Sequence, residues 1–425
     1  MRFLKAVGRA IRRFFLWLLM VALMVVLLVG GVTLFFYQNT GEKNLPPSQS
    51  SFGGVELQVN GYHWILPVLG GVTQKELVKP EDLTVQDLGT FVQQPTLQLP
   101  NDLQENATIW ISITDQNQQV VFAGTPEDFA TFQFVQNGQY QGQMRIAYPP
   151  LKGKATGEYF YQFRFTLDLE SEISISADTV YQGDVVAISV TGLPQGASIQ
   201  VETELTASQP VSRYGSMMIY LAVPYNQTDK EYPIKVQAGG YTKDFTVQVL
   251  YNQFKKVSLE TDTLAGSQQA VQQYQQVIWP LFETSQTDSP WSGVFQSPVE
   301  QPNDGVVLSD YGNFEYIADR TTPSRNIGVT YKCHADKPVY APASGTVVYA
   351  GNLELTGGIV VIEHGGGLKS YLYHMGSVSV QQGQTVEKGH QIGTTSQLLQ
   401  FDVRIGNKTI NPNLAMNGKG GLLWR

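Results

Sequence analysis

Two stretches near the C-terminus decide the fold of this chain: 338-PVYAPASGTVVYAG-351 and 359-IVVIEHGGGLKSYLYH-374. Both are built from short runs of β-branched and aromatic residues, which favour strands. Glycine separates the runs, and it permits the backbone conformations that a tight chain reversal requires. The pattern predicts antiparallel strands joined by turns, with Gly365, Gly366 and Gly367 at one bend. Residues 290–425 are therefore predicted to form an antiparallel β domain.

One amphipathic helix is predicted before this domain, over residues 261–282. Residues of the kind that cap helices stand at 261–263, and Pro280 is expected to end the helix. The apolar stripe of this helix consists of Val271, Tyr274 and Ile278. A stripe of this kind packs against a core, so residues 257–283 are interpreted as a helical connector that packs against the last domain.

Two further β modules are predicted in residues 55–170 and 171–252. In 158-EYFYQFRFTLDL-169, aromatic and aliphatic residues recur at every second position, the period of a strand with one buried face. The inward set is Tyr159, Tyr161, Phe163, Phe165 and Leu167. In the second module, Ala238-Gly239-Gly240 predicts a hairpin. The number and spacing of strands are typical of immunoglobulin-like sandwiches, so the chain is predicted to be mainly β.

The segment 14-FFLWLLMVALMVVLLVGGVTLFFY-37 contains no charge. A helix of this length spans roughly 36 Å, enough to cross a bilayer. The basic residues before it are Arg2, Lys5, Arg9, Arg12 and Arg13. They predict that residues 1–13 stay in the cytoplasm and that everything after Tyr37 is extracytoplasmic. A cleavable signal peptide is the alternative, but its apolar core is usually only about 7–15 residues long.

Composition limits the remaining possibilities. The chain has 425 residues, more than one ordinary domain, and residues 38–54 read as a flexible linker rich in Pro, Ser and Gly. The formal net charge of -8, with a cluster of basic residues at the N-terminus, leaves an acidic body that does not suit nucleic acid. The single cysteine, Cys333, excludes an intrachain disulfide and a Cys-x-x-Cys motif.

A series of short motifs in the last domain resembles one known family. In order, these motifs are 309–312 (SDYG), 338–342 (PVYAP), 345–348 (GTVV), 361–365 (VIEHG), 371–375 (YLYHM), 383–389 (GQTVEKG), 392–393 (IG), 401–404 (FDVR) and 411–412 (NP). The ordered set resembles the lysostaphin/LytM-type peptidoglycan endopeptidases, which have the duplicated hybrid motif fold. The resemblance implies a bacterial cell-wall protein and a zinc-dependent peptidase ancestry.

The zinc ligands of that family are not found at the matching positions. Asn326 and Thr330 stand where the family has a His and an Asp, and Gln400 stands at the ligand histidine of the late His-x-His motif. Leu398 occupies the other histidine position of that motif. Amide and hydroxyl oxygens are poor zinc ligands, so no cofactor is expected. The resemblance leaves His374 as a vestigial catalytic residue, and the cleft candidates are Tyr311, Asn326, Thr330, Tyr371, His374 and Gln400.

A replacement zinc site is the alternative to a lost one. The available side chains are Cys333, His334, Asp336, Glu363, His364 and His390. Adjacent residues on a strand point to opposite faces, so Cys333 and His334 are not expected to share a metal. Structural roles are the favoured interpretation for this set.

Three functions remain under these observations. The favoured one is a single-pass protein of the bacterial cytoplasmic membrane whose inactive LytM-like domain binds peptidoglycan stem or cross-bridge peptides or regulates a cell-wall hydrolase. The second is an active zinc endopeptidase with atypical ligands. The third is a structural surface protein made of β modules.

Overall fold

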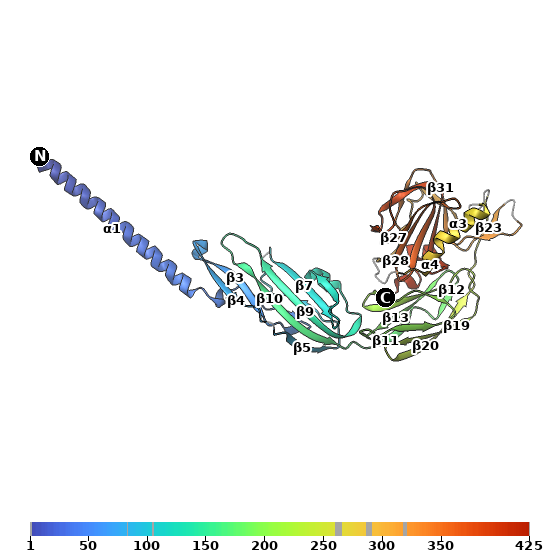
Figure 1. Ribbon diagram of the computed structural model, residues 1–425, viewed down its shortest axis with the longest axis horizontal. Coiled ribbons are helices and arrows are strands. Elements are labelled where there is room, and N and C mark those ends of the chain that lie inside the picture. Colours follow the sequence, from blue (N-terminus) through green and yellow to red (C-terminus); the bar gives the residue numbers. More distant parts are fainter. Residues whose placement is uncertain are drawn as a thin grey trace. The chain divides into compact units, whose positions relative to one another are not determined.

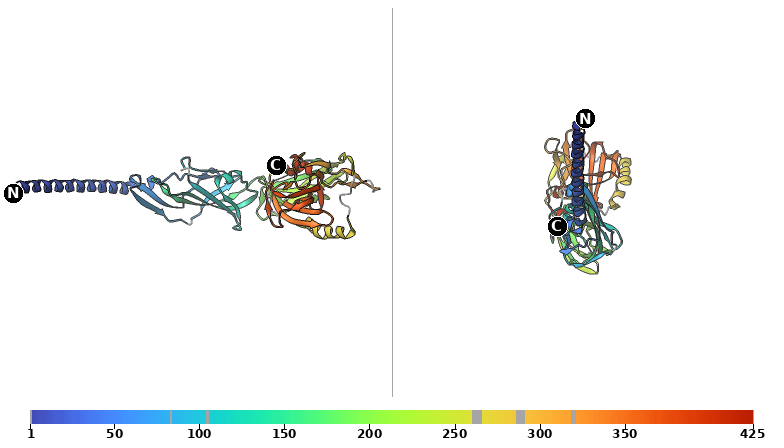
Figure 2. Two further views of the ribbon diagram at one scale, coloured as in Figure 1. Left: turned by 90° about the horizontal axis from the view of Figure 1, so that it is seen from above. Right: turned by 90° about the vertical axis from the view of Figure 1, so that its left-hand side faces the viewer.

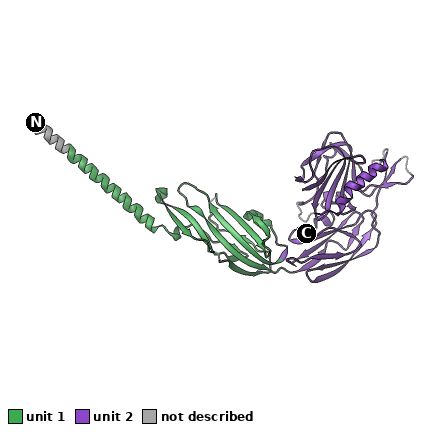
Figure 3. Cartoon of the chain, in the orientation of Figure 1, with its two compact units in different colours: residues 1–133, 137–169 green, residues 134–136, 170–425 purple. Residues whose placement is uncertain are grey.

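The computed structural model describes residues 2–82, 84–103, 106–259, 266–285, 291–317 and 321–424, with side chains from residue 11 onward. The chain divides into two compact units (Figure 3). The first unit contains Met1–Gln133 and Asn137–Leu169, and the second contains Phe134–Gln136 and Glu170–Arg425. Each unit is described by itself.

The first unit begins with a long helix, α1 (Arg2–Asn39), drawn in dark blue in Figure 1. Within the described residues, its segment Ile11–Asn39 is the one helix whose length and composition allow it to cross a membrane, and the most apolar part of that segment is not buried inside the protein. The predicted apolar helix is therefore present. The short helix η1 (Glu42–Asn44) follows it.

The main sheet of the first unit runs in the order β4-β3-β10-β9-β7-β8, with β5 alongside β10. The bounds are β3 (Gly61–Val68), β4 (Thr73–Lys79), β5 (Gln86–Phe91), β7 (Thr108–Asp115), β8 (Val120–Gly124), β9 (Gln136–Tyr148) and β10 (Thr156–Leu167). Two short helices, η2 (Leu69–Gly71) and α2 (Pro126–Thr131), complete this part. Neighbouring strands along the order are antiparallel, whereas β5 and β10 are parallel.

A small sheet with the order β2-β1-β6 supplies the other layer of this unit. It consists of β1 (Ser51–Phe52), β2 (Val55–Glu56) and β6 (Leu97–Gln98). Phe52 of β1 is fully buried, and its ring lies 4.9 Å from that of Phe163 and 5.0 Å from that of Phe165. The inward set predicted for β10 is confirmed, because all five of its side chains are at most 2% exposed.

The second unit begins with a sandwich of two sheets. One has the order β11-β13-β18-β16, with β17 beside β18, and the other has the order β12-β20-β19-β15. The bounds are β11 (Glu172–Ile175), β12 (Thr179–Tyr181), β13 (Val185–Thr191), β15 (Ile199–Glu202), β16 (Thr206–Ala207), β17 (Val211–Arg213), β18 (Ser216–Ala222), β19 (Glu231–Ala238) and β20 (Tyr241–Leu250). The two-residue strand β14 (Leu193–Pro194) belongs to neither of these sheets. The predicted hairpin is confirmed: Ala238 pairs with Tyr241, and Gly239 and Gly240 both have positive φ.

The last part of the chain forms a large sheet with the order β22-β25-β31-β29-β28-β27-β30, and β26 and β32 also pair with β31. The bounds are β22 (Gly305–Ser309), β25 (Val329–Cys333), β26 (Pro338–Tyr340), β27 (Gly345–Leu353), β28 (Gly357–Gly365), β29 (Leu368–Val378), β30 (Thr385–Val386), β31 (Gln391–Ile405) and β32 (Lys408–Ile410). Gly365 pairs with Leu368 across the predicted glycine bend. A small sheet, β21 (Lys256–Leu259), β23 (Phe314–Ile317) and β24 (Ser324–Arg325), and the helices α5 (Pro412–Met416) and η3 (Gly421–Leu423) complete the unit.

The sandwich and the last domain share one hydrophobic core. Buried side chains of β13, β17 and β18 belong to the same cluster as buried side chains of β25, β28, β29 and β31. At its edge the guanidinium of Arg213 lies 3.4 Å from the ring centre of Trp291 and donates to the Leu422 carbonyl. This continuity was not predicted, because sequence periodicity shows which face of a strand is buried but not what covers it.

The connector contains two helices, α3 (Gln268–Ile278) and α4 (Pro280–Glu283), drawn in yellow in Figure 1 beside the orange and red strands of the last domain. The further views in Figure 2 show the same neighbourhood. The predicted caps at 261–263 lie outside the described residues, and the side chain of Ser267 caps α3. Ile278 is fully buried against Leu353, Val361, Tyr371 and Tyr373, whereas Val271 of the predicted stripe is 36% exposed.

Candidate functional site

Three of the predicted cleft residues meet on adjacent elements of the last sheet. Thr330 of β25 lies directly opposite Gln400 of β31, and Tyr373 of β29 lies opposite Gln400 on its other side. Asn326, in the loop before β25, reaches Thr330 through a hydrogen bond of 3.0 Å. Asn326, Thr330 and Gln400 are each at most 4% exposed. The structure therefore brings these three side chains together in a buried polar site.

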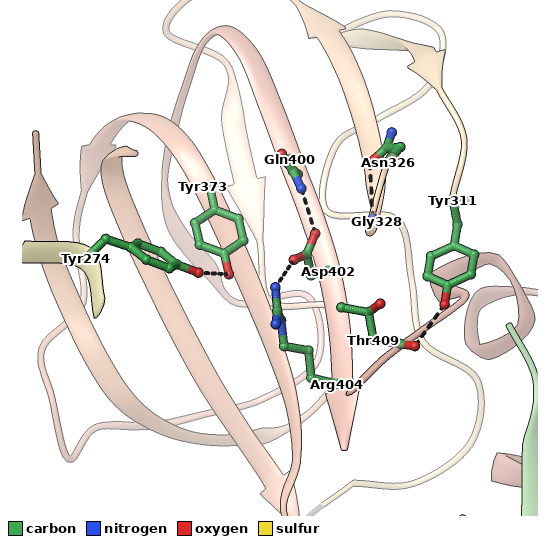
Figure 4. A network of polar contacts seen from close by, with 9 residues as sticks. All are labelled: Tyr274, Tyr311, Asn326, Gly328, Tyr373, Gln400, Asp402, Arg404 and Thr409. Carbon is green, nitrogen blue, oxygen red and sulfur yellow. Dashed lines mark hydrogen bonds and ion pairs between the residues drawn. The ribbon is translucent and has the colours of Figure 1, made fainter. Parts of the chain in front are cut away.

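Hydrogen bonds inside the protein hold the amide of Asn326. Its Nδ2 donates to the carbonyl of Ser309 at 2.9 Å as well as to Oγ1 of Thr330. Its Oδ1 accepts from the backbone N–H of Gly328 at 3.1 Å (Figure 4). Both donor hydrogens of the amide are thus used.

The amide of Gln400 takes part in a second network. Its Nε2 donates to Oδ1 of Asp402 at 2.9 Å, and Nη2 of Arg404 donates to Oδ2 of the same carboxylate at 2.9 Å. Asp402 has no exposed surface. A buried carboxylate needs such partners, because its unpaired burial costs several kcal/mol. Figure 4 shows this row along β31.

Sequence reasoning missed Asp402 and Arg404 as members of the site. Their positions follow Gln400 at intervals of two residues, the period that places side chains on one face of a strand. That spacing in the sequence could have identified Asp402 and Arg404 as neighbours of Gln400. Gly328 also contributes, because a Cβ there would lie 2.2 Å from Oδ1 of Asp402. Only glycine lets the loop after Asn326 approach this carboxylate so closely.

The other predicted residues are placed differently. Tyr311 lies at the junction with the sandwich, where its hydroxyl donates to the carbonyl of Thr409 at 2.8 Å and accepts from the backbone N–H of Tyr225. Tyr371 is fully buried under Phe282, opposite Asp402. Leu398 is half-buried on β31 and lies opposite Lys332.

His374 follows Tyr373 on β29 in a left-handed backbone conformation, with φ of 61°. Its Nε2 is buried and has no hydrogen-bond partner among the described residues. Burial lowers the pKa of the imidazole, and the charge of Asp402 acts in the opposite direction. No hydrogen bond joins this ring to Asn326, Thr330 or Gln400 within the described part of the chain, so it stands outside their network.

Comparison with known proteins agrees with these landmarks. Residues 324–412 match the sequence model of a protein family described as "Peptidase family M23". Lipoprotein NlpD of Yersinia enterocolitica is 35% identical over 83 residues, which are 18% of this chain and 86% of that protein. The chain belongs to peptidase family M23.

Two further relatives are matched over smaller shares of their length. Murein hydrolase activator NlpD of Salmonella dublin is 31% identical over 118 residues, 26% of this chain and 29% of that protein. Cell division protein DipM of Caulobacter vibrioides is 32% identical over 94 residues, 22% of this chain and 14% of that protein. The chain thus spans less than a third of the length of either relative.

The M23 site of this chain does not fit the zinc ion that the family resemblance implies. Zinc prefers imidazole, thiolate or carboxylate ligands. The three side chains at the matching positions are neutral, and hydrogen bonds inside the site already hold the amides of Asn326 and Gln400. The described residues therefore support no metal-dependent step at this site.

The alternative ligand set is not assembled either. Among the described residues, no three His, Cys, Asp or Glu side chains lie together in an arrangement suited to a metal. His364 is fully buried, with Nδ1 2.8 Å from the Ser344 carbonyl and Nε2 2.7 Å from the Ser370 hydroxyl. Burial raises the pKa of Cys333 to about 11, which keeps its thiol protonated near neutral pH.

Proposed function

We propose that this chain is a membrane-anchored extracytoplasmic protein whose M23 domain has lost hydrolysis and regulates a cell-wall hydrolase. One observation carries the proposal. The positions that match the family's zinc ligands hold Asn326, Thr330 and Gln400, and these side chains are buried in hydrogen bonds within the protein. A general base without a metal-bound water has nothing to activate in this chemistry.

The relatives support a regulatory role. One is named a murein hydrolase activator and another a cell division protein. The sheet that presents the site is intact, with Thr330, Gln400 and Tyr373 in register. A retained scaffold without its metal ligands suits recognition of a hydrolase, or of the peptidoglycan peptides on which that hydrolase acts.

The helix α1 supports the proposed location of this domain. Its apolar segment Ile11–Asn39 is long enough to span a bilayer of about 30 Å. The basic residues before it favour a cytoplasmic N-terminus, so the β modules would lie outside the cytoplasmic membrane in a single-pass arrangement. Protease added to intact spheroplasts should then remove the β modules and leave an N-terminal fragment. Protection of the whole chain would contradict this topology.

The function is tested with the full chain in lipid nanodiscs. Purified sacculi are incubated with the protein alone, with a cell-wall hydrolase of the same organism alone, and with both. We expect no new peptide ends from the protein alone and faster release of soluble fragments by the hydrolase in its presence. Release of new peptide ends by the protein alone would show an active endopeptidase. A protein that neither binds sacculi nor changes the rate of any hydrolase tested would fit a structural surface module instead.

A further inference from the structure

A pocket of about 280 Å³ lies between the connector helices and the M23 sheet. Its walls are apolar, with Trp279 and Phe282 from the connector and Ile327 and Leu355 from loops of the sheet domain. Pockets for drug-sized ligands are usually about 300–1,000 Å³. The smaller volume here suits one or two amino-acid side chains better than a cofactor.

The floor of the pocket carries no net charge. Gln400 and Arg404 line it, and both are bound to the buried carboxylate of Asp402. The carboxylate of Asp402 therefore balances the positive charge of Arg404. A charged occupant would lose its hydration without gaining an opposite charge, so the floor favours a neutral group.

Hydrogen-bond donors converge on the same floor. The hydroxyls of Tyr274 and Tyr373 lie 3.2 Å apart (Figure 4). Two hydroxyls carry two hydrogens and use only one between them, so the pair can donate the second to a ligand. Thr356 also lines the pocket, and its buried hydroxyl has no partner among the described residues. An uncharged hydrogen-bond acceptor, such as a peptide carbonyl, matches these groups.

The rim indicates a polypeptide partner. Trp279 is 52% exposed although it lies beside the pocket. Tryptophan, tyrosine and arginine are enriched among the residues that dominate binding energy at protein interfaces, and such residues cluster in well-packed pockets. Here all three types line a single pocket, together with aliphatic side chains.

We propose that this pocket receives one uncharged apolar side chain, leucine or phenylalanine in type, from a partner polypeptide, while the neighbouring backbone carbonyl accepts a hydrogen bond from the Tyr274–Tyr373 pair. This inference rests on the proposed function, because the polypeptide would belong to the hydrolase that the M23 domain regulates. The connector thus contributes three of the nine residues that line the recognition site, rather than serving only as a spacer.

The test uses the full chain in nanodiscs and N-acetyl-leucinamide and N-acetyl-phenylalaninamide as probes. Binding is measured by saturation-transfer NMR titration, with the amides of N-acetyl-aspartate and N-acetyl-lysine as charged comparisons. We expect the neutral probes to bind with dissociation constants of about 1 mM, the range of a small fragment, and at least about ten times more tightly than the charged ones.

Three variants locate the binding. Leu355→Trp fills the pocket from a half-exposed position and should weaken binding at least about tenfold. Tyr274→Phe keeps the ring but removes a hydroxyl, and it should weaken binding about three- to tenfold. The matched control is Val306→Trp, an equally bulky change at a 47% exposed position on β22, which should leave binding unchanged. Thermal unfolding of each variant shows whether it is folded. If Leu355→Trp is not folded, the probe affinity of Tyr274→Phe tests whether the probes bind in this pocket.

The outcomes separate this inference from the proposed function. If folded Leu355→Trp binds the neutral probes as the unchanged chain does, or if charged probes bind equally well, the pocket assignment is wrong. The regulatory function can still hold in that case, since hydrolase stimulation is measured separately. If the chain cleaves sacculi by itself, the proposed function fails, whatever the probe experiment shows.

Discussion

The side-chain amide of Gln400 donates a 2.9 Å hydrogen bond to the fully buried carboxylate of Asp402. The position that the family resemblance assigns to a zinc-binding histidine is thus occupied by a neutral amide that donates a hydrogen bond to a buried carboxylate. Asn326 behaves similarly, with both hydrogens of its amide bound inside the site. The polar groups of this site therefore stabilise the fold where the family resemblance places catalysis.

Removing the Gln400 amide should destabilise the M23 domain. Gln400→Leu leaves Asp402 with one fewer donor in a buried site, and the loss of a hydrogen bond to a charged group costs about 1.5–3 kcal/mol. Urea denaturation measures the difference. The matched control is Gln397→Leu on the same strand, where the side chain is exposed. Equal stability of the two variants would contradict a structural role for Gln400.

Restoring the family's ligand types should restore metal binding. The triple variant Asn326→His, Thr330→Asp and Gln400→His places two imidazoles and one carboxylate on positions that the structure brings together. We expect it to hold zinc at about one ion per chain after dialysis, because these are the ligand types that zinc prefers. The single variant Thr330→Asp is the control and should not retain zinc. Failure of the triple variant to gain zinc while remaining folded would show that this site lacks the ligand geometry.

Replacing one partner of the buried ion pair between Lys369 and Glu363 should strongly destabilise the fold. Their charged atoms lie 2.7 Å apart with 1% exposure each, and the Lys369 ammonium also donates to the carbonyl of Thr284 after α4. Lys369→Met leaves a buried uncompensated carboxylate, which costs about 3–5 kcal/mol in similar cases. Adding Glu363→Gln should recover part of that loss.

The matched control for this pair is Lys230→Met, which removes an exposed partner of Glu204. It should leave the denaturation midpoint unchanged, because exposed pairs contribute little. A double variant less stable than Lys369→Met alone would show that the cost does not come from the unpaired charge.

Stability should fall as the pH is lowered from neutral because of His364. Burial lowers the pKa of this histidine from 6.5 to about 4. The Ser344 carbonyl only accepts hydrogen bonds, so Nδ1 carries the hydrogen and Nε2 accepts from Ser370. Between pH 6.5 and 4 the unfolded chain binds this proton and the folded chain does not, so stability declines across that window by on the order of 3 kcal/mol.

Urea denaturation at a series of pH values measures this slope. His364→Gln keeps a donor and an acceptor and should flatten the slope between pH 6.5 and 4. The control His390→Gln changes an exposed histidine and should leave the slope as it is. An unchanged slope in His364→Gln would show that other groups account for the acid sensitivity.

Much of the fold follows from the sequence because strands with one buried face leave a period of two. The inward side chains of β10 and the glycine-rich bends between β19 and β20 and between β28 and β29 were all predicted and are confirmed. The continuous core between the sandwich and the M23 domain was not predicted. Met218 and Leu368 belong to the same cluster although they lie far apart in the sequence, and pairing at that distance leaves no local pattern.

The candidate site was predicted only in part, and for a similar reason. The family motifs located Asn326, Thr330 and Gln400, which the structure brings together. Asp402 and Arg404 were missed because they do not match a zinc-ligand position of the family. Their spacing from Gln400 nevertheless puts them on the same face of β31. The pocket beside the connector depends on how Tyr274 meets Tyr373, a contact between segments that only the folded chain brings together.

We propose that the M23 domain of this chain does not cut the cell wall itself. The most direct measurement is the number of new peptide ends released from purified sacculi by the full chain with zinc supplied, alongside the zinc retained after dialysis. We expect no release above the level of sacculi alone and no stoichiometric zinc. One retained zinc per chain together with release of new peptide ends would contradict it.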